Sequence, residues 1–213
     1  MSNHISWLDI LALVNVQHVG FIADNLVRDT PLIGSIAEAI SSTFLKRAAS
    51  KEEREKTLQD IMARQIKSEQ GVMVPLHVFP EACSTNGTHV IKLSKGAFYS
   101  LRKVRPTVFN YHEISSIKAS QDVAGFIFHT LVVMSCLGIS MDLKVLPVFE
   151  PNEFFWTNHW REGKEEKWEC YARVVQEIMA EVGGYPMSDL TMRDKFDFKK
   201  QLTALVKNKQ KAT

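Results

Sequence analysis

The sequence predicts an α/β protein: a single layered domain with a mostly parallel central sheet flanked by helices. Two observations predict it. Short apolar runs of strand type alternate along the chain with longer amphipathic segments of helical period. The 213 residues are enough for one ordinary domain, and 45% apolar with 23% charged residues is the balance of a globular chain with a buried core.

The first half of the chain contains the clearest local signals. Apolar residues at helical spacing predict a helix over residues 6–16. Ser50 followed by Glu53 is the signature of a capping box, and it predicts the start of a long amphipathic helix that Gly71 ends. The remaining elements of this half are short: a strand at 19–23, a helical pattern over 31–40 and a strand at 43–45.

The second half alternates in the same way. A valine-rich run predicts a buried strand over 72–79, with loop residues 80–87 behind it. The remaining elements are strands at 104–111 and 140–149, an apolar helix at 123–137, and two final helices at 164–182 and 188–207.

Three segments invite a membrane interpretation. Residues 123–139 are free of formal charge, but they fall short of the roughly 20 apolar residues that span a bilayer, so we expect a buried or half-inserted helix. Phe154, Phe155 and Trp156 form an aromatic cluster that either fills the core or anchors at an interface. The basic helix and tail at 188–213 is either a solvated face or a contact with anionic headgroups.

Composition excludes several classes of function. Lys and Arg total 26 against 24 Asp and Glu, so the net charge of +2 gives no support for a nucleic-acid partner. Cys83, Cys136 and Cys170 form no CxxC pair, which excludes a zinc ribbon, and the histidines show no metal-ligand spacing. Three free thiols fit a reducing compartment.

His4 and Asp9 are the first candidates for chemistry. Five residues apart, they would point about 140° apart on a continuous helix. They can meet only if His4 lies in a loop and Asp9 in the first turn of the helix that follows, where the carboxylate would orient the imidazole as a base. The chain has no GxSxG nucleophile, so the attacking hydroxyl would belong to the substrate. Taken alone, the pattern is common by chance, and a capping aspartate beside a loop histidine is the better interpretation of it.

Further blocks follow in order. Two segments come after His4 and Asp9: Phe79-Pro80-Glu81-Ala82-Cys83-Ser84 and then Lys95-Gly96-Ala97-Phe98. Together the three blocks resemble the glycerolipid acyltransferase family, whose blocks read HxxxxD, FPEGT and K-x-GAF. Residues 31–34 with 44–47 resemble the second block of that family, and residues 104–108 the fourth. The resemblance extends over nearly the whole chain, 1–213. The branch most similar is the acyl-CoA:lysophosphatidylcholine or lysophosphatidylethanolamine acyltransferases, on the segments 85–87, 146–151 and 171–175.

The resemblance implies an enzyme that transfers a fatty acyl group from acyl-CoA to the free hydroxyl of a lysophospholipid. His4 and Asp9 would be catalytic and Arg47 would pair with the lysolipid phosphate; the acceptor would be positioned by Pro80, Glu81, Ala82, Cys83 and Ser84. It implies no metal and no cofactor, acyl-CoA being a co-substrate, and a membrane-associated protein of the endoplasmic reticulum. Two alternatives stay open: an acyltransferase for lysophosphatidic acid or glycerol 3-phosphate, and a truncated, inactive lipid-binding relative.

The sequence departs from the family pattern at defined places. Ala82-Cys83 stands where the family has Gly-Thr. If the backbone at 82 needs a positive φ, alanine costs on the order of 1 kcal/mol there. We also expect the chain to lack the membrane segment that usually precedes the first block, and the strand that leads into His4.

Overall fold

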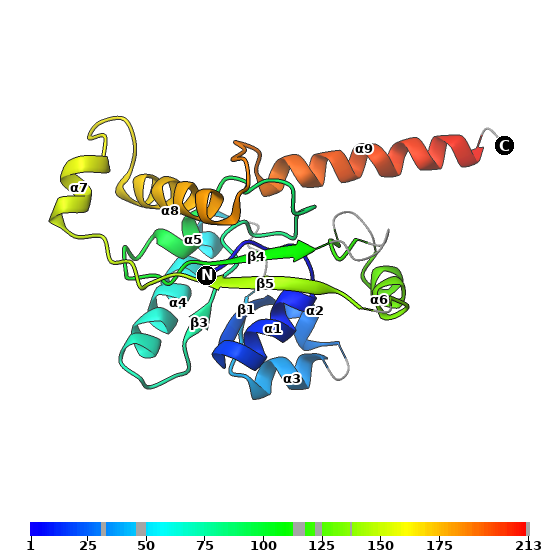
Figure 1. Ribbon diagram of the computed structural model, residues 1–213, viewed down its shortest axis with the longest axis horizontal. Coiled ribbons are helices and arrows are strands. Elements are labelled where there is room, and N and C mark those ends of the chain that lie inside the picture. The colour runs from blue at the N-terminus through cyan, green and yellow to red at the C-terminus, as the bar shows by residue number, and fades with distance from the viewer. Residues whose placement is uncertain (31–32, 46–49, 113–117, 122–124, 137, 212–213) are drawn as a thin grey trace.

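The computed structural model describes residues 1–30, 33–45, 50–112, 118–121, 125–136 and 138–211. Its centre is a three-stranded parallel sheet in the order β2-β1-β3 (Figure 1), which confirms the α/β class and the parallel sheet. The strands are β1 (Gly20–Asp24), β2 (Thr43–Leu45) and β3 (Leu76–His77). The connections are helical, as parallel pairing requires: α2 (Asn25–Arg28) and α3 (Ile33–Ala39) lead from β1 to β2, and α4 (Lys51–Glu69) leads to β3.

An antiparallel pair lies beside this sheet. β4 (Thr107–His112) pairs with β5 (Ser140–Val145) along all six residues, and α6 (Phe126–Met134) lies between them in the chain. Ser2 forms a parallel bridge with Thr107, and the Asn3 side chain exchanges two hydrogen bonds with the main chain of Phe109. The residues before His4 are therefore held on β4, although no strand was expected to lead into His4.

Two clusters of buried side chains lie on opposite faces of β4. Val108 belongs to the cluster formed with α8 (Lys167–Gly183), whereas Phe109 packs with Leu13 of α1 (Leu8–Gln17). Successive residues of a strand point to opposite faces, so this one strand joins both layers. The α8 cluster is the larger, because Tyr171, Val175 and Met179 recur at helical spacing and are fully buried. The other helices among the described residues are α5 (Lys95–Phe98), α7 (Glu153–His159) and α9 (Met192–Lys211), and α9 extends away from the body (Figure 1).

Three predicted strands are shorter than expected. In the run 72–79 only β3 pairs, and Val72 is 70% exposed. The amide of Val72 closes the end of α4 on the Lys67 carbonyl. Pro75 has no N–H to donate, so it bonds to β1 only through its carbonyl, which accepts from the Gly20 amide at 3.0 Å. The expected strands at 104–111 and 140–149 are likewise limited by Pro106 and Pro147.

Two local expectations have clear outcomes. The capping box is present: the Ser50 hydroxyl accepts from the Glu53 amide at 3.1 Å, and the Glu53 carboxylate accepts from the Ser50 amide at 2.9 Å. The aromatic cluster lies in the short helix α7, whose start Asn152 caps by accepting from the amide of Phe155. Phe155 is buried in the core while Phe154 is 74% exposed, so the cluster serves both environments.

Candidate active site

His4 and Asp9 meet in the arrangement that their spacing requires. His4 lies in the loop before α1 and Asp9 in its first turn, with His4 Nδ1 and Asp9 Oδ2 2.9 Å apart. The same Oδ2 accepts from the amides of Ile5 at 2.7 Å and Ser6 at 3.0 Å, so the turn itself orients the carboxylate. Because the Asp9 carboxylate accepts the hydrogen bond from Nδ1, the neutral imidazole carries its proton on Nδ1 and presents Nε2 as the basic nitrogen.

Tyr111 completes the set of hydrogen bonds to Asp9. Its hydroxyl, from β4, donates to Asp9 Oδ1 at 2.5 Å. Asp9 is fully buried, so a carboxylate there depends on donors rather than on water. Burial and the Asp9 charge both raise the pKa of Tyr111, which keeps its hydroxyl protonated as a donor. No motif in the sequence indicates this contact, because the two residues are 102 positions apart.

The loop after β3 fixes the backbone of His4. The Glu81 carboxylate accepts from the His4 amide at 2.7 Å, and the Thr85 amide donates to the His4 carbonyl at 2.7 Å. The Phe79 ring stacks on the imidazole with a centroid separation of 3.9 Å. These contacts bring together His4 and Glu81, which come from two sequence blocks 77 residues apart.

Glu81 is almost completely enclosed. It is 1% exposed, and its second oxygen accepts from the amide of Ile91 at 3.2 Å. Burial raises the pKa of the Glu81 carboxyl to about 8, although the amides of His4 and Ile91 act in the opposite direction. Both oxygens are therefore committed to the main chain, and Glu81 holds the loop and the His4 backbone together.

A cavity of about 650 Å³ opens at His4. It lies where the three parallel strands end: Asp24 of β1, Leu45 of β2 and Val78 just after β3 all line it. Ligands bind at the carboxyl ends of strands in open α/β sheets, because the loops there diverge. Most of the other lining side chains are apolar, so the cavity suits a substrate with a long hydrocarbon part.

The predicted substrate-binding residues divide into three groups. Ala82, Cys83 and Ser84 line the cavity beside His4. Pro80 and Glu81 are buried and are absent from that lining, so they shape the loop from beneath. Arg47 lies outside the described residues. In the described ranges no three His, Cys, Asp or Glu side chains are grouped to hold a metal ion.

Ala82 has a backbone conformation that is unfavourable for alanine. Its φ is 58°, in the left-handed region that glycine occupies without a steric penalty. Its amide closes the turn on the Phe79 carbonyl at 3.0 Å, so the conformation is part of the turn and not of a free end. An alanine in this conformation therefore places backbone strain in the wall of the cavity.

Comparisons with known proteins agree with this geometry. The chain is 26% identical to a lysophospholipid acyltransferase of Arabidopsis thaliana over 92% of its own length, and 26% identical to lysophosphatidylcholine acyltransferase 1 of Homo sapiens over 91%. It spans 47% and 34% of the length of these relatives. Its fold resembles the crystal structure of the 1-acyl-sn-glycerophosphate acyltransferase PlsC from Thermotoga maritima, with a TM-score of 0.51 and 16% identity over 86% of this chain and 63% of that one.

The Acyltransferase family model matches residues 1–111, which is just over half of the chain and contains His4, Asp9, the loop at 79–84 and Tyr111. The chain belongs to the acyltransferase family.

Proposed function

We propose that this protein is an acyl-CoA-dependent lysophospholipid acyltransferase. The observation that carries the proposal is the oriented imidazole of His4: a buried carboxylate holds Nδ1, and the ring lies in the wall of a largely apolar cavity. The names of the relatives from Arabidopsis thaliana and Homo sapiens support a lysophospholipid, and lysophosphatidylcholine in particular, as the acceptor.

In the proposed reaction His4 acts as a general base. Nε2 takes the proton of the acceptor hydroxyl as the oxygen attacks the thioester carbonyl carbon. The tetrahedral intermediate collapses, the carbon–sulfur bond breaks, and the imidazolium returns its proton to the departing CoA thiolate. Asp9 keeps the proton on Nδ1 and stabilises the imidazolium, and the hydrogen bonds from Ile5, Ser6 and Tyr111 keep Asp9 in place. Arg47, two residues after the cavity-lining Leu45, would pair with the acceptor phosphate, as the guanidinium fork allows.

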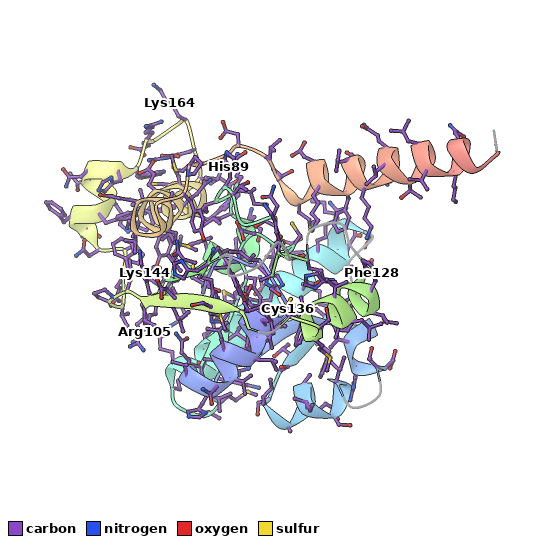
Figure 2. All side chains as sticks on the ribbon, turned by 45° about the vertical axis from the view of Figure 1, so that its right-hand side comes forward. His89, Arg105, Phe128, Cys136, Lys144 and Lys164 are labelled. Atoms are coloured by element: carbon purple, nitrogen blue, oxygen red, sulfur yellow. The ribbon has the colours of Figure 1, made fainter. Side chains whose placement is uncertain are left out.

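We also propose that the protein works on a membrane surface. No helix within the described ranges is both long and apolar enough to cross a bilayer. On α6, however, the large apolar side chains face outward, and Figure 2 places Phe128 at the periphery of the molecule. These residues are between 44% and 76% exposed: Phe126, Ile127, Phe128, Leu131 and Met134. A cluster of that kind on one short helix is typical of a contact with lipid, and both proposed substrates reside in or near a bilayer.

An acyl-transfer assay with purified protein tests the proposal. The acceptors are lysophosphatidylcholine, lysophosphatidylethanolamine, lysophosphatidic acid and glycerol 3-phosphate, each with a long-chain acyl-CoA. We expect transfer to the first two, and at least a 100-fold loss of kcat/KM in His4→Ala, because a general base contributes roughly 10²–10⁴-fold. His89→Ala is the matched control: His89 is exposed, lies outside the cavity lining and is labelled in Figure 2.

Other outcomes identify the alternatives. Transfer only to lysophosphatidic acid or glycerol 3-phosphate changes the acceptor class and leaves the mechanism intact. Transfer by His4→Ala at the wild-type rate contradicts the mechanism. Absence of transfer to every acceptor favours the inactive lipid-binding relative, the alternative motivated by Ala82 and Cys83.

A further inference from the structure

One wall of the catalytic cavity comes from the far end of the chain. Three residues of α9 line the cavity together with His4: Lys195, Phe196 and Lys199. Lys195 and Lys199 are four residues apart, which places them one turn apart on the same face of the helix. The basic C-terminal segment is therefore in part an active-site element.

Lys195 attaches α9 to the catalytic loop. Its Nζ donates to the Ser84 carbonyl and also contacts the Ser84 hydroxyl at 3.3 Å. Ser84 precedes Thr85, whose amide donates to the His4 carbonyl. The charge of Lys195 also acts on Glu81, where it lowers the carboxyl pKa against the larger effect of burial. These contacts set the position of α9 relative to His4 and bring the next turn, with Lys199, to the cavity.

Positive charge exceeds negative charge in the lining of the cavity. Its lining includes one carboxylate, Asp24, against the two ammonium groups of Lys195 and Lys199. The Lys199 side chain is exposed to solvent on the cavity side of the helix, whereas much of the remaining wall is apolar. A substrate with an anionic head and a hydrocarbon tail matches this division. A lysine ammonium is a compact point charge with three donors, which suits a phosphoryl oxygen at a solvent-exposed entrance.

We propose that Lys199, positioned by the Lys195–Ser84 contact, forms a phosphate subsite of the cavity that binds a phosphoryl group of one of the two substrates. The inference rests on the proposed function and deepens it. The phosphoryl group belongs either to the lysolipid headgroup or to CoA, and both present the same chemistry to the ammonium. Lys199 and Arg47 are different candidates for a phosphoryl contact, because they come from segments about 150 residues apart in the chain.

Steady-state kinetics with Lys199→Ala test the subsite. The matched control is Lys200→Ala, which removes the same charge from the same helix at a position that does not line the catalytic cavity. Both are measured in non-ionic detergent micelles, so that loss of attraction to an anionic membrane does not contribute. We expect Lys199→Ala to raise the KM of one substrate about tenfold with little change in kcat, because a hydrogen bond to a charged group is worth at least about a factor of ten. Lys200→Ala should stay within about twofold of wild type, and Lys199→Arg should restore most of the KM.

The KM values of the two substrates identify which of them supplies the phosphoryl group. A rise confined to the KM of acyl-CoA assigns the subsite to CoA, and a rise confined to the KM of the lysolipid assigns it to the headgroup. If Lys199→Ala behaves like Lys200→Ala toward both substrates, the subsite is refuted while the proposed function stands.

A binding measurement keeps the two proposals apart. Free CoA and glycerol 3-phosphate are titrated calorimetrically into the His4→Ala protein, with and without Lys199→Ala. If wild type transfers no acyl group but either probe binds about tenfold more weakly without Lys199, the proposed function fails and the phosphate subsite is retained. Equal binding with and without Lys199, or no binding of either probe, overturns the subsite.

Discussion

Ala82→Gly tests whether the loop beside His4 stores backbone strain. Ala82 has a φ of 58°, and an L residue there costs roughly 1–2 kcal/mol relative to glycine. Glycine also loses about 0.4–1 kcal/mol more conformational entropy on folding than alanine does. The first effect exceeds the second, so the substitution should raise the free energy of unfolding by about 0.5–1 kcal/mol.

The measurement is equilibrium unfolding in urea, with the slope of the transition checked for constancy. In a thermal scan, a change of this size corresponds to about 1–2 °C in Tm for a chain of this length. Ala63→Gly is the matched control, because Ala63 is exposed inside α4 and the same chemical change there should lower stability by about 1 kcal/mol. If Ala82→Gly is destabilising to a similar degree as Ala63→Gly, the strain argument is refuted.

Three further predictions follow from the same structure. Tyr111→Phe removes the hydroxyl that donates to the buried Oδ1 of Asp9, and should lower the free energy of unfolding by about 1.5–3 kcal/mol, while the amide bonds to Oδ2 keep part of the activity. A urea midpoint equal to that of wild type would contradict the role given to the hydroxyl. The pKa of Glu81 is raised in the folded protein from 4.5 to about 8, so the native state binds the proton more tightly than the unfolded state and loses stability as the pH rises through that interval. Glu81→Gln should therefore flatten the dependence of the unfolding free energy on pH between 4.5 and 8, and an unchanged slope would argue against the shift. Apolar insertion of α6 should hold the protein on vesicles in high salt, because Debye screening weakens only exposed charge contacts. In a sedimentation assay Ile127→Ser should release the protein from the vesicles, and release of wild type by salt alone would favour the lysines of α9 as the anchor.

Much of the site is encoded locally. His4 and Asp9 are five residues apart, and the first turn of α1 brings them together with the amides of Ile5 and Ser6. Their spacing stated the condition under which they can meet, and the resemblance to a family made that contact an expectation. The capping box at Ser50 is local in the same sense. The loop at 79–84 was placed beside His4 by the resemblance of its motif to a family, because no local signal connects Glu81 with a residue 77 positions earlier.

Strand lengths were predicted less well, since pairing depends on partners as well as on composition. The valine-rich run before Phe79 looked like a full strand. Pro75 and the turn that ends α4 leave it only two paired residues, which are enough to deliver the loop to the site.

The sequence by itself determined the α/β class, the start of α4 after Ser50 and the order of the blocks, because each rests on residues close together in the chain or on a motif. Only the tertiary structure decided that Tyr111 donates to Asp9, that Glu81 is enclosed and bonded to the main chain, and that Lys195 holds α9 against Ser84. The Tyr111 and Lys195 contacts join residues 102 and 111 positions apart. The physical reason is that such contacts depend on how β4 packs beside α1 and on how the start of α9 lies against the loop after β3. Packing is a property of the folded chain as a whole and leaves no periodic signal at either residue.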